Sequence, residues 1–248
     1  YTSARVQSSG KKTVQYGRID VRATLPQGQG IWPAIWALGS NFDERGWPGC
    51  GEIDIMEFLG DETETVHGTV HGPGYSGGNG IGSSYTLDSG TFAGESHTFS
   101  IVWDEDQVKW FVDGTQFHSV TRQEVEDAGN EWVFDNDFFL IFNVAVGGSW
   151  PGYPDDTTKF PQEMRIDYIR QYEAVDGDST APSSPSNLAT SDATASSVDL
   201  SWDAASDDTG VSAYVVTVDG EEYDRTENTS ISVTGLDADT SYEVGGAA

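Results

Sequence analysis

The segment 51–57 restricts the fold of this chain most, because three carboxylates alternate in it with apolar residues. Side chains of a strand alternate between its two faces, so Glu52 and Asp54 should share one face. Glu57 would fall on the opposite face of a regular strand. One extra residue near Ile55, a β-bulge, would return it to the first face. The pattern therefore predicts a bulged strand whose polar face collects three acids.

Clustered carboxylates have a specific chemical use. Burial and like charge push their pKa values apart, and two carboxyl groups in different protonation states are what glycoside hydrolysis requires. In a chain with 41 acidic residues, the same strand could instead be a solvated face. Trp32, Trp36 and Trp47 lie just upstream and favour a sugar-binding cleft, because flat aromatic rings stack on pyranose faces.

The charge of the chain excludes some partners. Twelve basic residues against 41 acidic ones give a formal net charge of −29. Nucleic acids and anionic membranes are therefore not expected as partners. Such self-repulsion is tolerable when salt screens it, since the Debye length falls to about 3 Å at 1 M salt. We expect a halophilic source, with an ordinary acidic secreted protein as the alternative. Cys50 is the only cysteine, and we expect it to be packed rather than catalytic.

Short alternating segments separated by glycine-rich turns predict an all-β protein. The expected strands are 13–25, 31–38, 52–57, 65–71, 99–103, 108–112 and 138–146, with a short helix at 122–128. Asp113-Gly114 is a hairpin signal. Many short strands of this kind form a β-sandwich or jelly roll.

The composition changes after Tyr172. We place a first domain at 1–172, a linker rich in Ser, Pro and acids at 173–184, and a second module at 185–248. The second module contains three evenly spaced strand patterns, at 198–202, 213–218 and 230–236.

Residues 1–172 resemble glycoside hydrolase family 16, and within it the laminarinase-like endo-β-1,3-glucanases. The resemblance rests on Gly30-Ile-Trp-Pro-Ala-Ile-Trp-Ala-Leu-Gly39, Trp47-Pro-Gly-Cys-Gly-Glu-Ile-Asp-Ile-Met-Glu57, His67-Gly-Thr-Val-His-Gly-Pro73, Phe142-Asn-Val-Ala-Val-Gly-Gly-Ser-Trp-Pro-Gly152 and Met164-Arg-Ile-Asp-Tyr-Ile-Arg170. Laminarinases carry the bulged E-x-D-x-x-E pattern seen here, whereas lichenases and carrageenases carry E-x-D-x-E. The resemblance implies a concanavalin A-like jelly roll.

The resemblance also implies roles for the three acids. Glu52 would be the nucleophile, Glu57 the general acid and then the general base, and Asp54 a partner that sets the charge of the nucleophile. A retaining mechanism of this kind needs the two glutamates about 5–5.5 Å apart. It needs no redox or organic cofactor.

Eight further residues are candidates for contact with sugar. They are Trp32, Trp36, Asn41, Arg45, Trp47, His71, Asn143 and Trp150. For each, packing in the core or rim is the competing interpretation. The expected substrate is a laminarin-like β-1,3-glucan. Mixed-linkage β-glucan, agarose or another galactan, and a non-catalytic glucan-binding role remain alternatives.

Many relatives bind a structural Ca²⁺, and the resemblance assigns Asp167 as one ligand. The chain begins where the second or third strand of the family is expected, which leaves the remaining ligands and the completeness of the sandwich open. Residues 185–248 resemble a fibronectin type III module through Leu200-Ser-Trp202, Asp207-Asp-Thr-Gly-Val211 and Gly235-Leu-Asp-Ala-Asp-Thr-Ser-Tyr242. Trp202 would be its core tryptophan. We expect a secreted, extracellular monomer.

Overall fold

The structure, a computed structural model, describes residues 1–173, 182–207 and 210–247. It divides into two compact units, Tyr1–Ala174 and Val175–Ala248. Most of the expected linker, 174–181, lies outside the described residues. None of the described helices is long and apolar enough to cross a membrane.

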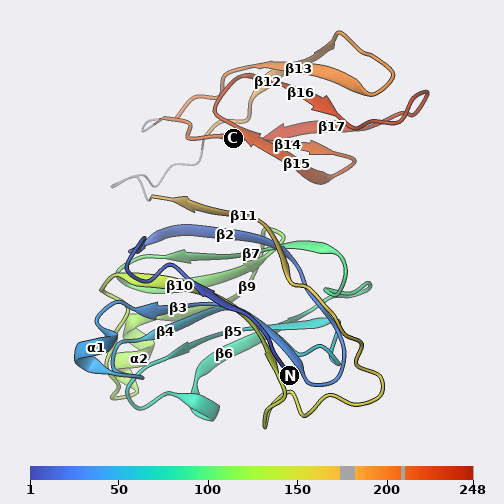
Figure 1. The fold of residues 1–248 in the computed structure, drawn as a ribbon. Coiled ribbons are helices and arrows are strands. Elements are labelled where there is room, and N and C mark those ends of the chain that lie inside the picture. The colour runs from blue at the N-terminus through green and yellow to red at the C-terminus, as the bar shows by residue number, and fades with distance from the viewer. Residues whose placement is uncertain (174–181, 208–209, 248) are drawn as a thin grey trace. The chain divides into compact units, whose positions relative to one another are not determined.

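The first unit is a sandwich of two antiparallel sheets (Figure 1). The six-stranded sheet has the order β1 (Arg5–Gln7), β10 (Phe138–Val146), β3 (Ile31–Gly39), β4 (Glu52–Phe58), β5 (Thr65–His71), β6 (Ile81–Thr86). The five-stranded sheet has the order β11 (Arg165–Tyr172), β2 (Gly17–Thr24), β7 (Ser96–Trp103), β8 (Gln107–Val112), β9 (Thr115–Thr121). The predicted all-β jelly-roll sandwich is confirmed.

The core lies between these two sheets and is rich in aromatic side chains. Trp103, Trp110, Phe58 and Phe99 are among its largest fully buried members. Their burial follows from the alternation of the strands, which sends every second side chain inward. Cys50 is a buried free thiol in a smaller apolar cluster, as expected.

Helix content is small. The elements are α1 (Phe42–Arg45), the 3₁₀ turn η1 (Gly77–Asn79) and α2 (Arg122–Asp127). The helix expected at 122–128 is confirmed as α2. It begins with a capping box, in which Thr121 and Glu124 satisfy each other's backbone N–H groups.

Two features of the strands differ from the sequence prediction. The strand expected at 13–25 begins only at Gly17, because Tyr16 and Gly17 have φ values of 64° and 89°, which interrupt an extended chain. Strands β1, β6, β9 and β11 of this unit were not among the expected strands. The hairpin at Asp113-Gly114 is confirmed between β8 and β9, with φ values of 47° and 80°.

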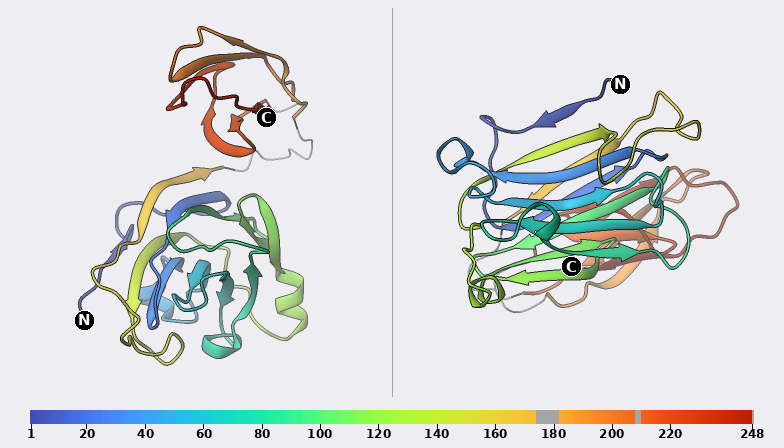
Figure 2. Two further views of the ribbon diagram at one scale, coloured as in Figure 1. Left: turned by 90° about the vertical axis from the view of Figure 1, so that its right-hand side faces the viewer. Right: turned by 90° about the horizontal axis from the view of Figure 1, so that it is seen from below.

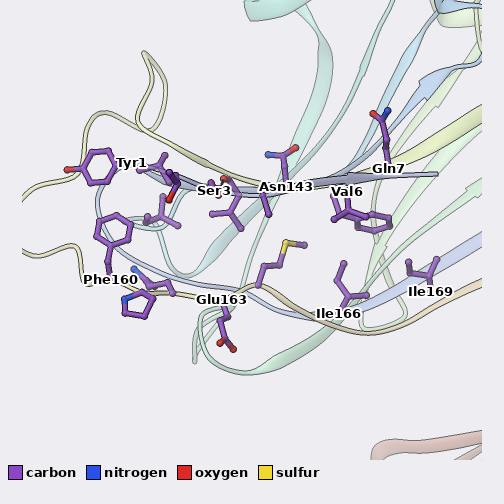
Figure 3. A pocket seen from close by; sticks show the side chains of 18 of the residues that line it. Tyr1, Ser3, Val6, Gln7, Asn143, Phe160, Glu163, Ile166 and Ile169 are labelled. Carbon is purple, nitrogen blue, oxygen red and sulfur yellow. Dashed lines mark hydrogen bonds between the residues drawn. The ribbon is translucent and has the colours of Figure 1, made fainter. Parts of the chain in front are cut away.

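An apolar groove lies along one edge of the first unit, between β1 and the segment leading into β11. Figure 2 (right) shows β1 at the outer edge of the six-stranded sheet, and Figure 3 shows side chains of both segments facing the groove. Its volume is about 1300 Å³. Val6, Phe160, Ile166 and Ile169 are among the lining residues. The groove lies at the sandwich edge and does not include the clustered acids.

The second unit contains two three-stranded antiparallel sheets. Their orders are β12 (Ser186–Ser191), β13 (Ser197–Asp203), β16 (Ser230–Thr234) and β15 (Glu221–Thr226), β14 (Tyr214–Val218), β17 (Val244–Ala247). The three expected strands fall within or around β13, β14 and β16. Trp202 packs with Leu200, Tyr214 and Val233 in a buried cluster, which confirms it as the core tryptophan.

Candidate active site

A bulge in β4 places all three acids on one face of the six-stranded sheet. Against β3, Met56 pairs with Ile35 and Asp54 pairs with Trp36, so Ile55 has no partner of its own. Against β5, the register shifts in the same place, between Asp54 and Glu57. The bulge predicted from the spacing of the acids is therefore confirmed. We call the surface that carries Glu52, Asp54 and Glu57 the site face.

A tryptophan from the opposite sheet supports the bulge. The indole Nε1 of Trp110 on β8 donates to the backbone carbonyl of Asp54 over 2.8 Å, across the core. Gly68 on β5 makes room for this ring, because a Cβ there would lie 2.5 Å from Trp110 Cδ1. The pattern of residues 108–112 predicts the strand β8 but not this role of Trp110. An alternating strand pattern does not show which inward side chain meets the other sheet's backbone.

Glu52 has a hydrogen-bond donor and a ladder partner beside it. Trp47 Nε1 donates to Glu52 Oε2 over 2.5 Å, and Glu52 pairs across the ladder with His71. His71 Nε2 lies 3.1 Å from Asp54 Oδ2. The indole N–H can only donate, so it fixes one carboxylate oxygen of Glu52 as an acceptor. The predicted residues Trp47, Glu52, Asp54 and His71 therefore form one connected group.

Burial controls the protonation of the other two acids. Desolvation, with the charge of Asp54 as a second cause, raises the pKa of Glu57 from its ordinary 4.5 to about 8. Asp54 is only 3% exposed. Desolvation, reinforced by the charge of Glu52 and a hydrogen bond with it, raises the pKa of Asp54 well above its ordinary 3.8. At neutral pH the site therefore holds Glu57 in its acid form, as a general acid requires.

The raised pKa of Glu57 predicts a stability cost at alkaline pH. Between pH 4.5 and about 8 the folded chain binds a proton that the unfolded chain has released, so stability falls as pH rises through this window. Glu57→Gln removes the cost. We expect the variant to gain on the order of 3–5 kcal/mol relative to the parent between pH 5 and pH 9. Denaturant unfolding followed by tryptophan fluorescence measures this difference, and a gap that does not widen with pH would contradict it.

Two exposed tryptophans flank the acids. Trp47, 47% exposed, lies beside Glu52, with its ring centroid 6.3 Å from that of His71. Trp150, 45% exposed, lies 5.2 Å from His67, the ladder partner of Glu57, and 5.3 Å edge-on from Trp32. Both rings remain available for stacking, and they lie on opposite sides of the carboxylates.

Trp36 and Asn143 lie on the same face but are already engaged. Trp36 Nε1 donates to Asn143 Oδ1 over 2.7 Å. The guanidinium of Arg5, from β1, sits 4.8 Å from the Trp36 ring centroid. One ring face of Trp36 is therefore covered by a cation. Arg5 is not among the predicted site residues, because no strand was expected where β1 lies.

The remaining predicted residues come from elements other than the acid-bearing strand β4. Asn41 precedes α1, and Arg45 at its end forms an ion pair with Glu131 at 2.9 Å. Asp167, on β11 of the other sheet, forms an ion pair with Arg22 at 2.9 Å. Among the described residues, no group of three His, Cys, Asp or Glu ligands includes Asp167. Ca²⁺ also takes backbone carbonyl oxygens as ligands, so the metal role of Asp167 stays a prediction.

A jelly-roll sandwich with three clustered carboxylates between exposed tryptophans defines a class, the carbohydrate-acting proteins built on this fold. Residues 1–170 match the model of the glycosyl hydrolases family 16. The chain belongs to that family. Residues 183–245 match the fibronectin type III domain.

Several known proteins are similar to this chain. The β-glucanase of Rhodothermus marinus is 38% identical over 182 residues, which are 71% of this chain and 64% of that protein. The laminarinase catalytic domain of Thermotoga maritima MSB8 is 59% identical, with a TM-score of 0.69 over 69% of each chain. The endo-β-1,3-glucanase of Pyrococcus furiosus is 55% identical, with a TM-score of 0.69 over 70% of this chain and 67% of that one. This chain thus spans somewhat less than two thirds of the Rhodothermus protein.

Proposed function

We propose that this chain is a retaining endo-glycosidase that hydrolyses β-1,3-glucosidic bonds in laminarin-like β-glucans. The observation that carries the proposal is the bulge at Ile55, which turns Glu57 onto the face of Glu52. The second support is electrostatic. Glu57 has a pKa raised to about 8, while Glu52 accepts a hydrogen bond from Trp47. The two glutamates thus have different environments, which a double displacement needs.

In the proposed first step, a carboxylate oxygen of Glu52 attacks the anomeric carbon of the bound glucosyl unit. Glu57 gives its proton to the glycosidic oxygen as the bond from that oxygen to the anomeric carbon breaks. In the second step, Glu57 removes a proton from water, whose oxygen attacks the anomeric carbon and releases Glu52. Two inversions at one carbon give net retention. Asp54, which shares a hydrogen bond with Glu52, is proposed to position it.

The choice of β-1,3-glucan rests on the named relatives and on the aromatic residues of the site face. Trp47 and Trp150 lie on opposite sides of the acids, so a chain that contacts both crosses the reacting carboxylates. This arrangement favours cleavage inside a polymer over cleavage at its end. The paired acids argue against a purely glucan-binding protein, which has no use for a proton donor and a nucleophile.

Digestion of laminarin, followed by proton NMR of the fresh products, tests the proposal. We expect oligosaccharides of intermediate length whose new reducing ends appear first as the β-anomer. Laminarin should be cut faster than lichenan or agarose. First products in the α-anomer would overturn retention, preference for lichenan or agarose would overturn the substrate, and binding of laminarin without cleavage would replace the enzyme with a binding protein.

We further propose that the chain is secreted and adapted to high salt. The support is the net charge of −29, together with a polymeric substrate. Screening should reduce repulsion between surface acids, so we expect the melting temperature to rise continuously from 0.1 M to about 3 M KCl. A melting temperature that is unchanged or lower in this range would contradict salt adaptation. Repeating the titration with sucrose at equal osmolality separates charge screening from general solute exclusion.

A further inference from the structure

Three ligand-type side chains converge on the site face. One carboxylate oxygen each from Glu52 and Asp54 and one ring nitrogen of His71 all lie within 4.8 Å of one another. Within the part of the chain that the structure describes, this is the one group of three such residues. The ladder explains the convergence, since Glu52 pairs directly with His71 and Asp54 lies two residues further along the same face.

The group contains polar atoms whose bonding is incomplete. Asp54 is 3% exposed, and its Oδ2 is buried without a well-aligned hydrogen bond among the described residues. His71 Nε2 lies 3.1 Å from it. A buried oxygen of this kind normally has a partner. It faces a ring nitrogen and a second carboxylate, and together these atoms can surround one small ion.

The donor set indicates which ion. An imidazole nitrogen suits Zn²⁺, Cu²⁺, Fe²⁺ and Ni²⁺, and carboxylate oxygens also ligate Zn²⁺. Ca²⁺ and Mg²⁺ prefer oxygen ligands alone. Zn²⁺ binds these atoms at about 2.0–2.2 Å, so ligand atoms around it lie roughly 3.4 Å apart. The three ligand atoms lie within 4.8 Å of one another and would have to move closer together to bind one ion.

We propose that Glu52, Asp54 and His71 form a binding site for Zn²⁺ or a similar late transition-metal ion. Trp47, which donates to Glu52 Oε2, would support the site as an outer partner. The metal would occupy the carboxylate that the proposed function assigns as nucleophile. Binding would therefore inhibit hydrolysis and compete with the glucan. This consequence rests on the proposed function, whereas metal binding itself does not.

Calorimetric titration of the full chain with Zn²⁺ tests the site. Millimolar Mg²⁺ is included throughout, so that exposed carboxylates are occupied by a competing hard cation. We expect one saturable site in the parent and at least about tenfold weaker binding in His71→Gln and in Asp54→Asn. His97→Gln is the matched control, because His97 also faces a carboxylate, Asp113 at 2.7 Å, but belongs to no group of three among the described residues. It should bind Zn²⁺ like the parent.

Circular dichroism and melting curves show whether His71→Gln and Asp54→Asn are folded. One folded variant of the two is enough to test the metal site. Saturable binding that survives unchanged in one of them would overturn the proposal, as would a parent that shows only weak, unsaturable uptake. The titration uses no substrate. A chain that binds Zn²⁺ at this site but cuts no glucan supports the metal site and counts against the proposed function. Inhibition by Zn²⁺ that EDTA reverses, and that laminarin weakens, supports both.

Discussion

Glu52→Gln should nearly abolish β-glucan hydrolysis, lowering kcat/KM by about 10⁴-fold or more. The amide keeps the shape of the side chain and can accept the Trp47 hydrogen bond, which is 2.5 Å long in the parent. It cannot form the glycosyl ester, so the first displacement has no nucleophile. Reducing-sugar release from laminarin at high salt measures the loss. Laminarin binding should persist, because the flanking tryptophans are unchanged.

A matched control separates chemistry from charge. Glu64 is an exposed glutamate in the turn before β5, so Glu64→Gln removes the same charge at a distance from the site face. It should keep the activity of the parent. Glu52→Ala with added azide gives a sharper test, because azide can attack the anomeric carbon from the vacated side. The product should be the α-glycosyl azide. A β-glycosyl azide would instead assign Glu52 as the acid/base and reverse the two roles.

Much of the site could be predicted because its chemistry is local in the sequence. Glu52, Asp54 and Glu57 can share one face only if the strand contains an inserted residue. The structure places that residue at Ile55. Alternation is a hard constraint, since a one-residue shift exchanges the faces of every following side chain. The jelly roll could also be predicted from alternation. Many short alternating strands have few ways to bury one face each.

What the sequence could not show depends on contacts between distant segments. Trp110 reaches Asp54 across the core, and Arg5 covers a face of Trp36 from the edge strand β1. Nothing within either segment encodes its partner. The ion pair between Arg45 and Glu131 is similar, because it joins residues 86 positions apart. Such pairings are set by the order of strands in the sheets, which strand patterns alone leave open.

Glu57→Gln should produce a different failure from Glu52→Gln, because it removes the proton donor and leaves the nucleophile. On laminarin we expect kcat/KM to fall by about 10²–10⁴-fold. On an aryl β-glycoside with a good leaving group, the first step needs no proton, so it should proceed at a rate close to that of the parent. The glycosyl-enzyme should then accumulate, because water lacks its general base. A burst of phenol followed by slow turnover measures this, and equal losses on both substrates would contradict the acid/base role.

The pH profile gives the same assignment an independent test. Glu57 must be protonated to act as an acid, and burial raises its pKa to about 8. In the parent, kcat/KM for laminarin should therefore decline as pH rises through about 8, because the free enzyme loses this proton. The decline should be absent from the burst rate of Glu57→Gln on the aryl glycoside, since glutamine does not titrate. If the alkaline limb persists there, another group controls it, and Asp54, whose pKa burial also raises, becomes the group to replace next.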